Sequence, residues 1–254
     1  MLFKTSYFIP AFNEERMIRI YLPDTYDQTS AIYPVLYMHD GQNVFDDEGA
    51  VGGRSLRLKD YLDRNKVQLI VVAIDSGANR MVEYRLWPPG ELSEKLTGRS
   101  ESLDAKGREY IDFIAKDLKE YIDDTYRTRK ESNYMAGISL GGLITTYALC
   151  RYPSVFSRGA GISSGFFRNQ EELEKFIGLS NLSTIDRLYL DCGTSESSDG
   201  RINQAFYDSN ERIYRLLKEK LDCIEFNVVE NGEHKYESFS DRVEKVMTFL
   251  MDEN

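Results

Sequence analysis

Histidine, cysteine and tryptophan are scarce in this 254-residue chain, which has two, three and one of them. The three cysteines, Cys150, Cys192 and Cys223, match neither a disulfide framework nor a zinc site in their number and spacing, so we expect reduced core residues. The acidic run 46–48 departs from the calcium-loop pattern, and the glycines of 137–142 lack the lysine of a nucleotide-binding loop. The sequence therefore predicts a protein without a metal or a cofactor.

Long apolar runs and basic clusters are also missing. No window approaches the roughly 20 apolar residues of a membrane span, and residues 1–23 lack the apolar segment of a signal peptide. The formal net charge is −10 and is spread along the chain, which disfavours binding to nucleic acid. We expect a soluble, cytoplasmic protein that binds neither nucleic acid nor membranes. Whether it forms a homo-oligomer stays open.

The remaining composition predicts one globular domain over residues 1–254, because 41% of the residues are hydrophobic and no repeat or linker divides the chain. Short apolar runs predict strands at 17–22, 35–39, 69–74, 134–137, 158–162, 188–192 and 225–229. Helical periodicity predicts helices at 107–125, 142–151, 203–221 and 238–251. This alternation predicts an α/β fold with a mostly parallel sheet and helices on both faces. The first two runs, joined by a short turn region, are expected to form an antiparallel edge.

The segment 75–106 breaks this pattern. It contains several glycines and prolines, many charges and the single tryptophan, Trp87. We expect a long, cap-like surface excursion that shapes a binding site and adds little to the core. The alternative is a disordered loop.

A glycine-rich junction surrounds Ser139. Gly137, Gly141 and Gly142 lie between an apolar run and a helical pattern, and residues 137–141 have the spacing G-x-S-x-G. A sharp strand-to-helix turn that exposes a nucleophilic serine needs small neighbours of this kind. The other interpretation is a tight turn with an incidental serine.

A serine nucleophile needs a base, and the base needs an acid that orients it. His234 follows the last predicted strand, so it is expected at the same sheet edge as Ser139. The acid is expected between them in sequence, after a strand. Glu196 is our choice and Asp199 the reserve, whereas Asp191 lies within the strand and is explained as well by a structural hydrogen bond.

A developing oxyanion needs two donors, for which the backbone N–H groups of Leu140 and Gln42 are the candidates. Gly41 would let the backbone approach a ligand closely. His39 is interpreted as a strand-end residue that packs beneath the site.

Five segments in this order resemble the esterase branch of the α/β-hydrolases, which includes esterase D-like, feruloyl, acetyl-xylan and siderophore esterases and mycolyltransferases. They are PVLYMHDGQNVFDD, YIDFIAKDLKEYIDDTYRT, NYMAGISLGGLITTYALCRYPSVF, LYLDCGTSE and ENGEHKYESF. The resemblance spans roughly residues 15–250 and implies an α/β-hydrolase fold.

The resemblance implies a nucleophile at Ser139, a base at His234 and an acid at Glu196, where relatives often have aspartate. It also implies that Asp40 contacts polar groups of the substrate and gives Trp87 a substrate role, against which stands a role as a packing anchor. The expected function is a serine esterase acting on a small-molecule ester: a short-chain acyl ester, an acetylated or feruloylated sugar, or a siderophore-type ester. Acyl transfer to an alcohol and a non-catalytic binding protein are the alternatives.

Overall fold

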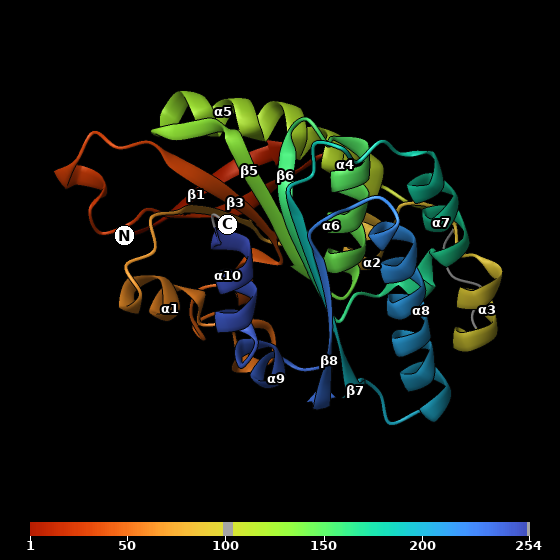
Figure 1. Cartoon of the computed structure of the whole chain (residues 1–254). Helices are drawn as coiled ribbons and strands as arrows, with labels where there is room; N and C mark the ends of the chain where they lie inside the picture. Colours follow the sequence, from red (N-terminus) through yellow and green to blue (C-terminus); the bar gives the residue numbers. More distant parts are fainter. Residues whose placement is uncertain (99–103, 253–254) are drawn as a thin grey trace.

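A single mixed sheet of eight strands forms the centre of the computed structural model, which describes residues 1–98 and 104–252 (Figure 1). The strands are β1 (Leu2–Ile9), β2 (Glu14–Tyr21), β3 (Tyr33–His39), β4 (Ile70–Ile74), β5 (Thr128–Ile138), β6 (Phe156–Ile162), β7 (Arg187–Ser195) and β8 (Ile224–Glu233). Their order in the sheet is β1-β2-β4-β3-β5-β6-β7-β8. From β4 to β8 every neighbouring pair is parallel, so the predicted mostly parallel α/β sheet is confirmed.

The antiparallel edge is made by different strands than the sequence suggested. β2 pairs antiparallel with β1 and with β4, as in the pair Ile18 and Ile74. The predicted antiparallel pairing of the 35–39 run is wrong, because β3 lies between β4 and β5 and is parallel to both. All seven residues of β3 are buried, which suits a strand covered on both faces. β1 was not predicted, since this edge strand leaves Phe3 and Phe8 about half exposed.

Helices cover both faces of the sheet (Figure 1). They are α1 (Leu58–Arg64), α2 (Arg80–Tyr84), α3 (Glu91–Thr97), α4 (Gly107–Phe113), the π-helical turn η4 (Ile114–Leu118), α5 (Lys119–Thr125), α6 (Leu140–Arg151), α7 (Gln170–Leu179), α8 (Gly200–Lys218), α9 (Tyr236–Ser240) and α10 (Val243–Met251), with the short turns η1 (Tyr26–Gln28), η2 (Gly41–Asn43), η3 (Val51–Gly53) and η5 (Phe166–Arg168). α1, α9 and α10 lie on one face, and α4, α6 and α8 on the other. Each face has its own large cluster of buried apolar side chains. None of the helices in the described ranges has the length and apolar character needed to cross a bilayer.

The predicted helices are found with shifted ends. The 107–125 pattern is one continuous helical segment, α4-η4-α5, and the 203–221 pattern is α8, which begins at Gly200 after the capping residue Asp199. The 238–251 pattern is divided into α9 and α10.

The 75–106 excursion is more ordered than expected where the structure describes it. It contains α2 and α3, and Tyr84 and Leu86 are fully buried in the same core cluster as Leu143 of α6. The expectation that the segment adds little to the core is therefore wrong, because its apolar residues pack on α4 and α6. Residues 99–103 lie outside the described residues.

The sheet order creates a crevice at the carboxyl ends of β3 and β5. From β3 the chain adds β4 on one side, and it later returns to add β5 on the other side. The helices that follow such strands leave on opposite faces, so the loops after β3 and β5 diverge and leave space between them. This topological switch point places residues 40–43 and Ser139 side by side.

Candidate active site

Ser139 stands at a sharp turn between β5 and α6. Its backbone angles, φ 59° and ψ −118°, lie in a region that costs a non-glycine residue on the order of 1–3 kcal/mol. The Ser139 N–H donates to the carbonyl of Ile162 at 2.9 Å, and the Ser139 carbonyl accepts from the N–H groups of Gly142 at 3.1 Å and Gly165 at 2.9 Å. Backbone hydrogen bonds to two neighbouring segments therefore hold the strained turn in place.

The three glycines around Ser139 differ in how strictly packing requires them. A Cβ on Gly137 would lie 2.4 Å from the carbonyl carbon and oxygen of Gly141, and a Cβ on Gly142 would lie 2.2 Å from the hydroxyl of Ser164. A Cβ on Gly141 would lie 3.4 Å from the nearest side-chain atom, in His39, which is an ordinary contact. A residue without a Cβ is thus needed at Gly137 and Gly142, whereas the space at Gly141 also admits alanine.

His234 comes directly after β8 and is held by Glu196. Nδ1 of His234 lies 2.7 Å from Oε2 of Glu196. Because an ionised carboxylate only accepts, Nδ1 carries the hydrogen, and the neutral form of the ring has its lone pair on Nε2. The ring also packs against Phe206 and Phe239, with centroid distances of 5.0 and 5.2 Å. This imidazole has a defined tautomer and orientation.

Glu196 is buried and fully engaged. Its Oε1 accepts from the Ser163 hydroxyl at 2.5 Å and from the Gly193 N–H at 2.5 Å. Burial by itself raises the pKa of Glu196, but the hydrogen bonds from His234, Ser163 and Gly193 outweigh burial and hold the pKa below its ordinary value. The carboxylate therefore stays ionised at neutral pH.

The two other candidate acids have structural partners. Asp199 accepts the Arg201 N–H at 2.9 Å as the N-cap of α8, and its second oxygen pairs with the Arg201 guanidinium at 3.0 Å. Asp191 is fully buried and accepts from Arg242 at 2.9 Å and from the Ser163 N–H at 3.1 Å. Of the three carboxylates, Glu196 is the one hydrogen-bonded to His234.

Ser139 and His234 open into a common pocket of about 380 Å³. Its wall includes Asp40, Gln42, Asn43, Val51, Ser76, Gly77, Arg80, Ile138, Lys235, Tyr236 and Phe239. This volume lies in the lower part of the range typical of small-molecule sites.

Asp40 lines this pocket, and its carboxylate forms an ion pair with an arginine. The guanidinium of Arg80 donates to both Asp40 oxygens, at 2.5 and 2.7 Å, and also to the carbonyl of Ile138 at 3.3 Å. Burial alone lowers the pKa of Arg80, but the bonds to Asp40 outweigh burial and raise it. The ion pair of Arg80 with Asp40 was not found from the sequence, because it depends on how α2 packs over the loop after β3.

Tyr236 is a second residue that the sequence did not reveal. Its hydroxyl accepts from the Asn43 side-chain amide at 2.8 Å. Burial raises its pKa, so the phenol keeps its proton at neutral pH. It can therefore donate a hydrogen bond to a ligand in the pocket.

Close packing and side-chain hydrogen bonds hold the turn after β3. A Cβ on Gly41 would lie 2.7 Å from the carbonyl oxygen of Ala73 in β4, so packing on the sheet by itself requires glycine here. The expected role of Gly41 in close approach to a ligand stays a prediction. The Gln42 amide donates to the Ser76 hydroxyl at 2.8 Å and accepts from the Ser76 N–H at 3.0 Å. Gln42 and Leu140 lie in the first turns of η2 and α6, where backbone N–H groups lack acceptors within the helix.

His39 lies in the core beneath the turn. Its Nδ1 is 3.3 Å from the Tyr110 hydroxyl, and burial lowers the pKa of His39 from 6.5 to about 3. The charge of Asp40 raises this pKa and that of Arg80 lowers it, each by less than burial does. The imidazole is therefore neutral and serves packing.

This burial predicts a pH dependence of stability. Between pH 6.5 and about 3 the unfolded chain binds a proton at His39 that the native state does not, so the free energy of unfolding falls on acidification, by up to about 1.4 kcal/mol per pH unit. We expect His39→Gln to have a flatter dependence in urea unfolding measured from pH 7 to 4. Parallel curves for the two proteins would contradict this assignment.

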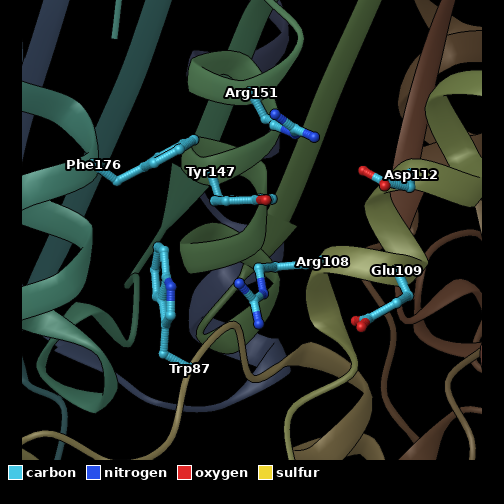
Figure 2. Close-up of a pocket in the computed structure, with 7 residues that line it drawn as sticks. All are labelled: Trp87, Arg108, Glu109, Asp112, Tyr147, Arg151 and Phe176. Atoms are coloured by element: carbon cyan, nitrogen blue, oxygen red, sulfur yellow. The ribbon is translucent and has the colours of Figure 1, made fainter. Parts of the chain in front are cut away.

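Trp87 lies at a different cavity, of about 480 Å³ (Figure 2). Its ring meets Tyr147 of α6 and Phe176 of α7 edge-on, at centroid distances of 5.7 and 6.0 Å. Arg108 and Arg151 line the same cavity, together with the carboxylates of α4. The expected substrate role at the Ser139 pocket is corrected: the Trp87 ring packs on two helices, because residues 84–86 turn the excursion into the core.

Comparison with known proteins identifies the family of this chain. The sequence pattern of the family described as "Putative esterase" matches residues 9–247. The chain therefore belongs to this esterase family, and it is a carboxylic ester hydrolase by class.

Individual relatives are distant in sequence. YbbA of Bacillus subtilis (strain 168), described as an uncharacterized protein, is 27% identical over 209 residues, which are 81% of this chain and 79% of YbbA. An IroE-like serine hydrolase from Shewanella oneidensis has a TM-score of 0.77 at 20% identity, covering 99% of this chain and 82% of that one. The siderophore hydrolase EstA from Aspergillus nidulans has a TM-score of 0.73 at 17% identity, covering 99% and 95%. At these identities the two structures establish the shared fold.

Proposed function

We propose that the protein is a serine carboxylesterase that hydrolyses esters of small acids through Ser139, His234 and Glu196 without a metal or cofactor. The observation that carries the proposal is the 2.7 Å hydrogen bond from His234 to the buried Glu196 at a pocket that Ser139 also lines. The strained turn at Ser139 and the membership in an esterase family support the same assignment.

The first half-reaction forms an acyl-enzyme. Nε2 of His234 takes the proton of the Ser139 hydroxyl while the oxygen attacks the ester carbonyl. The N–H groups of Leu140 and Gln42 stabilise the oxyanion, and Glu196 stabilises the imidazolium. The imidazolium then protonates the leaving alcohol, which departs as the carbonyl re-forms.

The second half-reaction releases the acid. A water molecule takes the place of the alcohol and gives its proton to His234 as it attacks the acyl carbonyl. The tetrahedral intermediate collapses, and the proton returns from His234 to the Ser139 oxygen. The free enzyme is thereby restored.

The pocket offers a polar contact to the substrate. Much of its polar lining is already paired, as in Asp40 with Arg80 and Gln42 with Ser76. The Tyr236 hydroxyl offers a hydrogen bond to the ligand. Short-chain acyl esters, acetylated or feruloylated sugars and siderophore-type esters are the proposed classes, the last supported by the fold shared with the siderophore hydrolase EstA.

Covalent labelling tests the nucleophile. A fluorophosphonate should add once to the folded protein, and peptide mass spectrometry should place the adduct on Ser139, because only an activated serine reacts rapidly. Ser139→Ala should show no adduct. Folded wild-type protein that remains unlabelled would contradict the proposal and favour a binding protein on this fold.

A substrate panel then separates the classes. It would contain p-nitrophenyl esters of increasing acyl length, methyl ferulate, acetylated xylooligosaccharides and a trilactone siderophore, with wild type compared to Ser139→Ala. An added alcohol acceptor tests for acyl transfer. If new esters form in place of the free acid, the main reaction is acyl transfer and not hydrolysis.

A further inference from the structure

A chain of buried hydrogen bonds continues from His234 past Glu196. While Oε2 of Glu196 faces His234, Oε1 accepts from Ser163, which follows β6 and is fully buried. The Ser163 hydroxyl lies 2.7 Å from Nη1 of Arg242. Ser163 is therefore placed between the carboxylate and a buried guanidinium.

The chemistry of these groups fixes the direction of each hydrogen bond. A guanidinium can only donate, so the Ser163 oxygen accepts from Arg242 and its own hydrogen goes to Glu196. With this donor and the Gly193 N–H on Oε1, the remaining oxygen points to His234. A glutamate has flexible side-chain torsions, and these two donors remove that freedom.

Arg242 is itself anchored on two further segments. Nη1 donates to Asp191 of β7 at 2.9 Å, and Nη2 donates to the Ser238 hydroxyl of α9 at 3.0 Å. Asp191 also accepts the Ser163 N–H at 3.1 Å. The buried charges of Arg242 and Asp191 compensate each other, so the array is a fixed frame beneath Glu196.

The backbone of Ser163 adds an independent observation. Its φ of 44° lies in the left-handed region, where glycine is the least strained residue. A serine there bears a strain that glycine would avoid. The hydroxyl, which glycine lacks, is what the serine contributes.

We propose that Ser163 is a positioning residue that, held by Arg242, fixes the Glu196 carboxylate for its hydrogen bond to His234. This role rests on the proposed function, because it acts through Glu196. It predicts that the Ser163 hydroxyl matters for turnover only while Glu196 is present.

A double-mutant cycle tests this role. In the wild-type background, Ser163→Ala should lower kcat for p-nitrophenyl acetate by about 10- to 100-fold with little change in KM, the loss expected for a hydrogen bond to a charged group. In a Glu196→Ala background the same change should cost less than about 2-fold. Ser163→Gly removes the hydroxyl and relieves the backbone, so it should lose the same activity and keep the fold.

Ser164→Ala is the matched control, because the adjacent Ser164 hydroxyl is buried and has no hydrogen-bond partner within residues 1–98 and 104–252. It should retain wild-type turnover. Equal losses from Ser163→Ala in both backgrounds, or wild-type kcat in Ser163→Gly, would overturn the positioning role while leaving the esterase assignment in place. Wild-type activity in Glu196→Ala would instead remove the acid from the mechanism, and the role of Ser163 with it.

Discussion

Ser139→Ala is expected to lower kcat/KM for p-nitrophenyl acetate by about 10⁴- to 10⁶-fold, the range typical when a serine nucleophile is removed. The strained backbone at φ 59° is kept, so the free energy of unfolding should change little. The proposed oxyanion donors and the pocket remain, and they are expected to account for the residual rate above that of water.

The measurement compares initial rates and urea unfolding for wild type, Ser139→Ala and the Ser164→Ala control. A burst of p-nitrophenol equal to the enzyme concentration is expected where deacylation limits turnover, and it should vanish in Ser139→Ala. Hydrolysis by Ser139→Ala at the wild-type rate would exclude Ser139 as the nucleophile.

Glu196→Gln is expected to lower kcat by about 10³- to 10⁴-fold, because the acid fixes the tautomer of the base. In the wild type Oε2 accepts from Nδ1 of His234. The donors Ser163 and Gly193 face the other position, so the glutamine oxygen would lie there and the amide N–H₂ would face His234. His234 would then carry its hydrogen on Nε2 and could not accept the serine proton.

Asp199→Asn is the matched control for this prediction, because Asp199 is the alternative acid in the same loop. Asparagine is as good an N-cap as aspartate, so α8 should be preserved. We expect kcat within about 2-fold of wild type, since Asp199 bonds to Arg201 and not to His234. Loss of activity in Asp199→Asn with full activity in Glu196→Gln would reverse the assignment.

The fold class was predictable because periodicity marks buried strands and amphipathic helices. Strand direction was not, and β3 was placed in the wrong pairing because an all-apolar run has the same pattern in either orientation. β1 was missed because an edge strand with exposed Phe3 and Phe8 lacks the signal of a buried run.

The candidate site likewise contains residues that the sequence predicted and residues that it did not. Ser139, Glu196 and His234 each follow a strand, so the rule that carboxyl ends share one edge brings them together. Arg80, Ser163 and Arg242 escaped prediction because their partners lie between 33 and 79 residues away and are selected by packing. Trp87 was misplaced for a related reason, since nothing in the sequence says onto which helices an excursion folds.

The packing of Trp87 has a spectroscopic consequence. As the only tryptophan, it is the source of the intrinsic emission excited at the red edge of the protein absorption. The backbone carbonyls of Trp87 and Pro88 accept from the side-chain amide of the buried Asn169 at 2.9 and 3.1 Å, which holds the Trp87 backbone at the start of α7. A change in emission therefore reports the seating of one segment on α6 and α7, and the native protein carries a local optical probe of that junction without any label.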